Sequence, residues 1–154
     1  FNLLFVMLLS ALCFTFTSCS DDDDDDKTTD YAKEITGKYK GDIYLAGGND
    51  TPIATDAIIE VTRIADNKVK LEMNQQILVM KIDIEYDSDV EYANDKYSIK
   101  KGTTKVTIPV EGGGDMEVDV ELDGSFDKDG NSTINIAVDL PDSPVSVVYK
   151  GKRQ

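Results

Sequence analysis

Apolar and polar side chains alternate with a period of two along most of this chain. In the clearest stretch, 116–126, every second residue is apolar or small and the positions between are mostly acidic. The apolar set is Met116, Val118, Val120, Leu122 and Phe126, and the acidic set is Glu117, Asp119, Glu121 and Asp123. Successive side chains of a strand point to opposite faces, so this pattern indicates an antiparallel strand with one buried and one solvated face.

The same alternation recurs elsewhere in the chain. In 37–46, Tyr39, Ile43 and Leu45 share a face with two glycines, and 76–86 carries five apolar residues on one face. Those five are Leu78, Met80, Ile82, Ile84 and Tyr86. Shorter candidate strands are 54–64, 68–73, 96–100, 103–110, 132–139 and 145–151, separated by turn-forming residues. The one window that could form a helical turn is 31–36. The sequence therefore predicts an all-β domain of about eight or nine strands, arranged as a single antiparallel barrel or a sandwich.

The N-terminal segment has the order of a secretory signal. An almost continuously apolar run from Leu3 to Phe16 is followed by small residues and a cysteine. The run is about 14 residues long, whereas roughly 20 are needed to cross a bilayer, so a permanent transmembrane helix is the poorer interpretation. No basic residue precedes the run, and we expect the natural start to lie further upstream.

Residues Phe16-Thr17-Ser18-Cys19 resemble a bacterial lipobox. The resemblance implies cleavage between Ser18 and Cys19 and lipidation of Cys19, which would anchor the protein firmly through several acyl chains. The alternative is an ordinary signal peptide with an incidental cysteine. Cys13 would be removed with the signal, so the mature domain would have no disulfide and would depend on its hydrophobic core.

Six consecutive aspartates, 21–26, follow the cysteine. Like charges repel one another, so we expect 19–34 to be a solvated, disordered tether between the signal peptide of 1–18 and a domain of 35–154. A cysteine followed by Ser20 and an acidic cluster also resembles the surface-export signal of Bacteroidetes-type lipoproteins. That resemblance implies display on the outer membrane surface. The alternatives are a spacer without an address and a location on the periplasmic face.

Composition excludes several classes of function. The 30 acidic residues outnumber the 16 basic ones and give a net charge of −14, so we expect no nucleic-acid partner. Histidine is absent, which excludes Ser-His-Asp catalysis and histidine-ligated metals. Paired carboxylates such as Asp83 and Glu85 fall on the expected solvent face, whereas a glycosidase needs two in a cleft. We therefore expect no enzyme, cofactor or metal.

The segment 126–132 offers a possible calcium loop, because carboxylate and amide oxygens are hard ligands. However, Gly130 comes too early for an EF-hand and no terminal glutamate follows. A tight hairpin turn around Asp129 is the better interpretation.

The two ends of the domain carry a family resemblance. Thr36-Gly37-Lys38-Tyr39-Lys40-Gly41 opens the first strand and Val147-Val148-Tyr149-Lys150-Gly151-Lys152 closes the last. Across about 35–152 the chain looks like Bacteroidetes-type lipoproteins with a calycin-like domain. Calycins proper have Gly-x-Trp on the first strand, and here Tyr39 stands at the tryptophan position. The resemblance implies an up-and-down barrel whose first and last strands meet.

Two functions remain open for such a barrel. The first is a non-enzymatic interaction module on the outer membrane, which would recognise protein or glycan through loops such as 47–52 and 112–115. The second is a carrier of a small hydrophobic ligand. Six inward residues are possible ligand contacts in the lumen: Tyr39, Ile43, Met80, Ile84, Val120 and Phe126. The same side chains are bulky enough to fill the interior instead, which we favour. We expect a monomer in either case.

Cys19→Ala removes the only thiol available for lipidation after signal cleavage. We expect this variant to move from membranes to soluble fractions, measured by fractionation and immunoblotting. Unchanged membrane fractionation would contradict the anchor.

Overall fold

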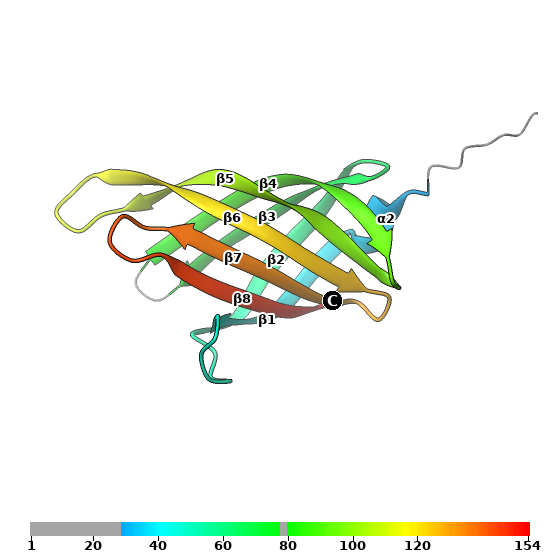
Figure 1. The fold of residues 1–154 in the computed structure, drawn as a ribbon, viewed down its shortest axis with the longest axis horizontal. Coiled ribbons are helices and arrows are strands. Elements are labelled where there is room, and N and C mark those ends of the chain that lie inside the picture. Colours follow the sequence, from blue (N-terminus) through cyan, green and yellow to red (C-terminus); the bar gives the residue numbers. More distant parts are fainter. Residues whose placement is uncertain (1–28, 78–79) are drawn as a thin grey trace, which may run out of the picture.

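The chain folds into a closed, eight-stranded antiparallel barrel with a short helix at one end (Figure 1). The computed structural model describes residues 29–77 and 80–154. Its helix is α2 (Tyr31–Ile35). Its strands are β1 (Gly37–Leu45), β2 (Ala54–Ala65), β3 (Lys68–Ile77), β4 (Met80–Ala93), β5 (Lys96–Pro109), β6 (Asp115–Asp127), β7 (Asn131–Asp139) and β8 (Val145–Arg153). Each strand pairs with the next, and β8 pairs with β1, which confirms the predicted up-and-down barrel.

Some strand boundaries differ from the prediction. The expected strand 76–86 is divided, because Ile77 ends β3 and Met80 begins β4. β4 then continues to a tight turn at Asn94 and Asp95, whose φ angles of 52° and 61° match a type I′ hairpin. The expected strands 96–100 and 103–110 are one strand, β5, with a register shift between Ile99 and Gly102.

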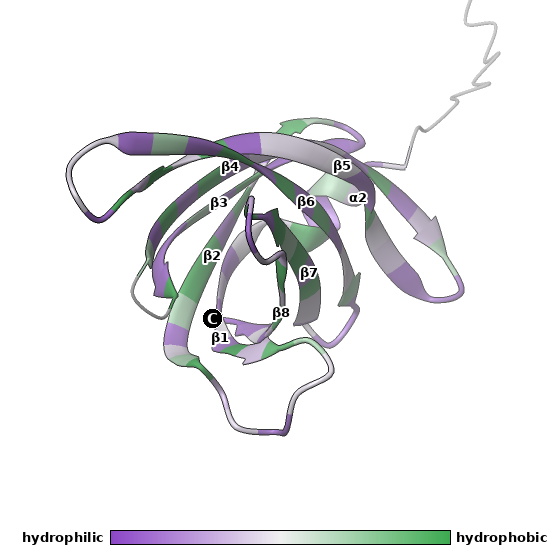
Figure 2. Ribbon diagram, turned by 60° about the vertical axis from the view of Figure 1, so that its left-hand side comes forward, coloured by the Kyte–Doolittle hydropathy of each residue, from purple (hydrophilic) through white to green (hydrophobic). Residues whose placement is uncertain are grey.

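The barrel interior is apolar. Alternation directs one side chain in two inward along each strand, and Figure 2 shows the resulting change between apolar and polar residues. Val118, Val120, Leu122 and Phe126 of β6 are all buried, as the sequence predicts. Leu45 differs from its prediction and is 44% exposed. It lies at the end of β1, beyond Ile43, the last β1 residue that pairs with β2.

Pairing of β1 with β8 closes the barrel and requires two glycines. Gly41 lies opposite Gly151 in this ladder. A Cβ on Gly41 would lie 2.0 Å from the Lys150 carbonyl oxygen, and one on Gly151 would lie 2.2 Å from the Tyr149 hydroxyl. The first and last strands can therefore approach, and the Tyr149 ring can lie against the backbone, only because both positions lack a side chain.

Helix α2 covers one end of the barrel. The Asp30 carboxylate accepts a hydrogen bond from the Lys33 N–H (3.1 Å) and caps the helix, while Ala32 and Ile35 are fully buried. The Ala32 N–H donates to the Asp66 carbonyl (3.1 Å) in the β2–β3 turn. The folded unit therefore begins before residue 35, and the last part of the expected tether belongs to it. Within 29–77 and 80–154, no helix has the length and apolar character needed to cross a bilayer.

Gly41→Ala tests the closure of the barrel. Because the new methyl group would overlap backbone atoms of β8, we expect the free energy of unfolding to fall by at least about 2 kcal/mol in urea denaturation. The control is Gly48→Ala in the β1–β2 loop, where the nearest atoms belong to Leu45 at 3.2 Å. Equal stability of the two variants would contradict this account.

Candidate functional site

The loops that join alternate strands gather at the end of the barrel opposite α2. In an up-and-down barrel, the β1–β2, β5–β6 and β7–β8 connections necessarily share an end, here called the loop end (residues 46–53, 110–114 and 140–144). In Figure 1 the β5–β6 hairpin extends furthest. Both loops expected to contact a partner, 47–52 and 112–115, lie at the loop end.

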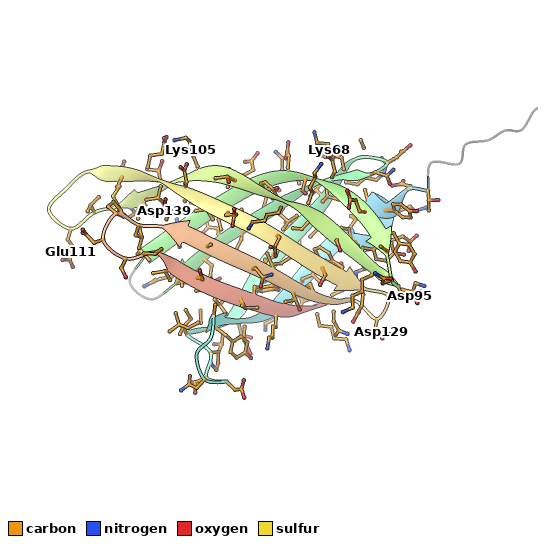
Figure 3. All side chains as sticks on the ribbon, viewed as in Figure 1. Lys68, Asp95, Lys105, Glu111, Asp129 and Asp139 are labelled. Carbon is orange, nitrogen blue, oxygen red and sulfur yellow. The ribbon has the colours of Figure 1, made fainter. Side chains whose placement is uncertain are left out.

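The loop end presents apolar and acidic side chains together. Val110 is 46% exposed, and Leu45, the last residue of β1, is exposed to a similar degree. Glu111 and Asp139 lie at this end, whereas Asp95 and Asp129 lie at the opposite end (Figure 3). The glycines Gly112 and Gly113 have positive φ angles of 105° and 86°, which L residues rarely adopt. The exposed surface of the loop end is therefore neither purely apolar nor purely acidic.

The barrel interior is filled by its own side chains. Tyr39 and Phe126 pack edge to face with ring centroids 5.1 Å apart. The cavity enclosed near Ile59, Leu71, Met73 and Ile84 measures only about 10 Å³. Small-molecule sites generally occupy roughly 300–1,000 Å³. Among the described residues, this interior cavity is therefore far too small for a ligand.

The six possible lumen contacts all have inward positions. Tyr39, Ile43, Ile84, Val120 and Phe126 are buried, and Met80 is partly buried against the core. Of the six, Ile84 borders the small enclosed cavity. The structure thus places these residues as the packed core that we favoured, and their contact with a ligand stays a prediction.

Tyr39 joins the barrel to α2 at the helix end, the end of the barrel that α2 covers. Its hydroxyl donates to the Ile35 carbonyl (2.8 Å) and accepts from Nη2 of Arg153 (2.9 Å). The same guanidinium donates to the Glu34 carbonyl and lies 5.5 Å from the Tyr39 ring centroid. Burial raises the pKa of Tyr39, and the Arg153 hydrogen bond partly opposes that rise. Sequence analysis did not single out Arg153, because nothing local marks a residue that contacts a tyrosine 114 positions away.

Comparison with protein-family models now identifies the domain. Residues 35–152 match the model of the calycin-like β-barrel domain. The chain belongs to this family. Among curated proteins no match was found.

One solved structure resembles the calycin-like domain. It is the crystal structure of a "putative outer membrane protein" from Bacteroides fragilis, with a TM-score of 0.55 and 14% sequence identity. The similarity covers 81% of this chain and 53% of the other, so the present chain spans about half of that protein. At this identity the similarity concerns the fold.

The segment 126–132, for which the sequence favours a hairpin turn over a calcium loop, contains the turn between β6 and β7 of the calycin-like domain. Both carboxylate oxygens of Asp127 accept hydrogen bonds from Asn131, one from its backbone N–H and one from its side chain, each 2.8 Å long. These bonds lower the pKa of Asp127. In the described residues, no group of three or more acidic or cysteine side chains could hold a metal ion.

The paired carboxylates lie on the outer face of the barrel, as predicted. Several bind lysines on neighbouring strands, as in Lys105–Glu117 (2.7 Å) and Lys101–Glu121 (2.8 Å). Such exposed pairs contribute little to stability individually. Ser18 and Cys19, the expected cleavage and lipidation residues, lie outside the described residues.

Two buried tyrosines provide a matched test of the interior. Among the described residues, the Tyr149 hydroxyl has no hydrogen-bond partner, and burial raises its pKa. We expect Tyr149→Phe to change the free energy of unfolding by less than about 1 kcal/mol or to increase it, because an unpaired polar atom is removed. Tyr39→Phe should cost about 1–3 kcal/mol, because the Ile35 carbonyl and Arg153 lose a partner.

Urea denaturation followed by circular dichroism measures both variants. Equal losses of stability would contradict the assigned hydrogen bonds.

Proposed function

We propose that this protein is a lipid-anchored, non-enzymatic interaction module of the bacterial outer membrane that binds its partner from the outside of a filled barrel. The observation that carries the proposal is the interior: an enclosed volume of about 10 Å³ leaves recognition to the outer surface and the loops. The calycin-like fold is typical of binding modules.

The proposed location rests on the N-terminal sequence and on the solved relative. The apolar run before Thr17-Ser18-Cys19 and the aspartates that follow favour export and lipidation. The similar Bacteroides fragilis structure is named for an outer membrane protein, which agrees with an envelope location. Display on the outer surface is the favoured arrangement within this proposal.

The position of the anchor favours the loop end as the contact surface. The first described residues precede α2, so the tether joins the barrel at its helix end (Figure 1). From Cys19 to Thr29 are ten residues, which span at most about 35 Å. A domain attached in this way presents the loops 46–53, 110–114 and 140–144 away from the membrane.

The second candidate function is a carrier of a small hydrophobic molecule. The apolar character of Tyr39, Ile43, Met80, Ile84, Val120 and Phe126 favours it. It requires these side chains to separate and open a volume at least an order of magnitude larger than the present cavity. Native mass spectrometry of protein extracted from its own membranes distinguishes the two, and we expect the mass of the lipidated chain alone.

Site-specific photo-cross-linking on intact cells tests the interaction function. A benzophenone amino acid at the exposed Val110 position should form an adduct with one defined partner protein or glycan, and the same probe at Asp129, at the helix end, serves as the control. Equal labelling at both ends, or a stoichiometric apolar ligand in the native mass spectrum, would contradict the proposal.

A further inference from the structure

The hydrogen-bonded wall of the barrel is incomplete between β4 and β5. Each strand has 14 residues, yet they pair only from Val90–Ile99 to Ala93–Lys96, next to their connecting turn. By contrast, β4 pairs with β3 from Met80 to Asp89, and β5 pairs with β6 as far as Pro109. Toward the loop end, β4 therefore stays paired with β3 and β5 stays paired with β6, but β4 and β5 no longer pair with each other.

Side chains replace the missing ladder over a short distance. The Tyr86 and Ser88 hydroxyls donate to the Lys100 carbonyl (2.8 and 3.1 Å), and the Thr104 hydroxyl donates to the Glu85 carbonyl (3.1 Å). The Tyr86 ring lies against Gly102, where a Cβ would come within 2.3 Å of its hydroxyl. Beyond Glu85 and Thr104, the described residues show neither a ladder pair nor a side-chain hydrogen bond between β4 and β5.

The free edge of β4 can be assigned from the Glu85 contact. Backbone groups of alternate strand residues point to the same side, so the Glu85 carbonyl that faces β5 places the Asp83 and Lys81 groups on that side too. Unpaired strand edges of this kind are templates for an added strand. On the other side of the gap, Thr103–Pro109 of β5 spans roughly 23 Å.

A surface depression of about 600 Å³ lies next to this edge. Asp83 and Glu85 of β4, Glu60 of β2, Glu72 of β3 and Lys105 of β5 are among the residues that line it. Three of its carboxylates stand in one row, because Glu60 pairs with Glu72 and Glu72 pairs with Glu85. Like charges directly opposite each other in a sheet are destabilising.

Only the outer members of this row are paired with lysines. Glu60 lies 3.5 Å from Lys38, and Glu85 lies 2.5 Å from Lys70. Among the described residues, Glu72 and Asp83 have no such partner. The free edge and the unpaired carboxylates therefore face one space, and both would be satisfied by an extended chain that carries cations.

We propose that the β4–β5 gap is a strand-addition site for an extended, lysine- or arginine-bearing segment of a partner protein. The segment would pair its main chain with the Lys81–Asp83 edge of β4 and place basic side chains against Glu72 and Asp83. Main-chain hydrogen bonds supply affinity in this mode, and alternate side chains supply specificity. The inference rests on the proposed interaction function and specifies its partner class.

Fluorescence anisotropy with a defined peptide tests this site. The probe is a fluorescein-labelled octapeptide that alternates lysine with threonine or valine, and we expect saturable binding. One control peptide carries glutamate in place of lysine. A second keeps the lysines but is N-methylated at alternate backbone amides, which prevents strand pairing, and neither control should bind.

Charge-reversing variants locate the binding site. Glu72→Lys and Asp83→Lys should each weaken binding by about tenfold or more. Both are expected to fold, because they reduce repulsion among the carboxylates. The matched control is Glu91→Lys, an exposed position on the paired part of β4, which should leave affinity within about twofold. Backbone hydrogen exchange at Lys81 and Asp83 should slow on peptide binding.

Three results would overturn the strand-addition site: no binding, equal binding of the N-methylated peptide, or equal weakening by Glu91→Lys. The last two would indicate charge attraction without strand pairing. Val110 cross-linking that persists without peptide binding would reject the strand-addition site and leave the interaction function standing. Loss of Val110 cross-linking with peptide binding intact would move the contact surface from the loop end to the gap.

Discussion

Pairing of β1 with β8 is the constraint on which the rest of this structure depends. It fixes the circumference of the barrel and hence the interior volume that side chains must fill. Gly41 and Gly151 permit the close approach of the two strands, and Tyr39, Tyr149 and Phe126 then occupy the enclosed space. A calycin-like barrel filled in this way is stabilised by the core that a hollow carrier would give up. This is why we propose that recognition uses its outer surface.

Closure of the barrel also explains why the β4–β5 gap is unusual. A complete barrel has no free edge, so an interrupted ladder restores locally the very feature that closure removes. In part of the interrupted stretch, the hydroxyl groups of Tyr86, Ser88 and Thr104 donate hydrogen bonds to carbonyl groups of the facing strand. These bonds keep the two strands associated. The unpaired backbone and the repelling carboxylates beside it are both unfavourable for folding alone. Their coincidence in one place is the physical reason to seek a partner there.

Much of this fold could be predicted from local pattern, and the rest depends on distant contacts. Alternation identified the buried faces of β1, β4 and β6, and turn residues identified most connections. The same pattern wrongly joined the end of β3 to the start of β4, because alternate residues from Leu78 through Met80 to Tyr86 are apolar and no turn-forming residue interrupts them. The Asn94–Asp95 turn lacked the usual glycine. Arg153 and the β4–β5 gap could not be predicted, since both depend on register between segments that only the closed barrel brings together.

In the proposed function, the two ends of the barrel separate stability from recognition. At the helix end, Tyr39, Arg153 and α2 form a partly buried hydrogen-bonded network in which each group satisfies another. At the loop end, a Cβ on Gly112 or Gly113 would meet no atom within 4 Å, so these positions are limited by backbone conformation and not by packing. Substitutions there need only preserve the turn, and they leave the core untouched. In the proposed arrangement, a domain tethered at its helix end could therefore change what its loops contact while the closure that stabilises it remains the same.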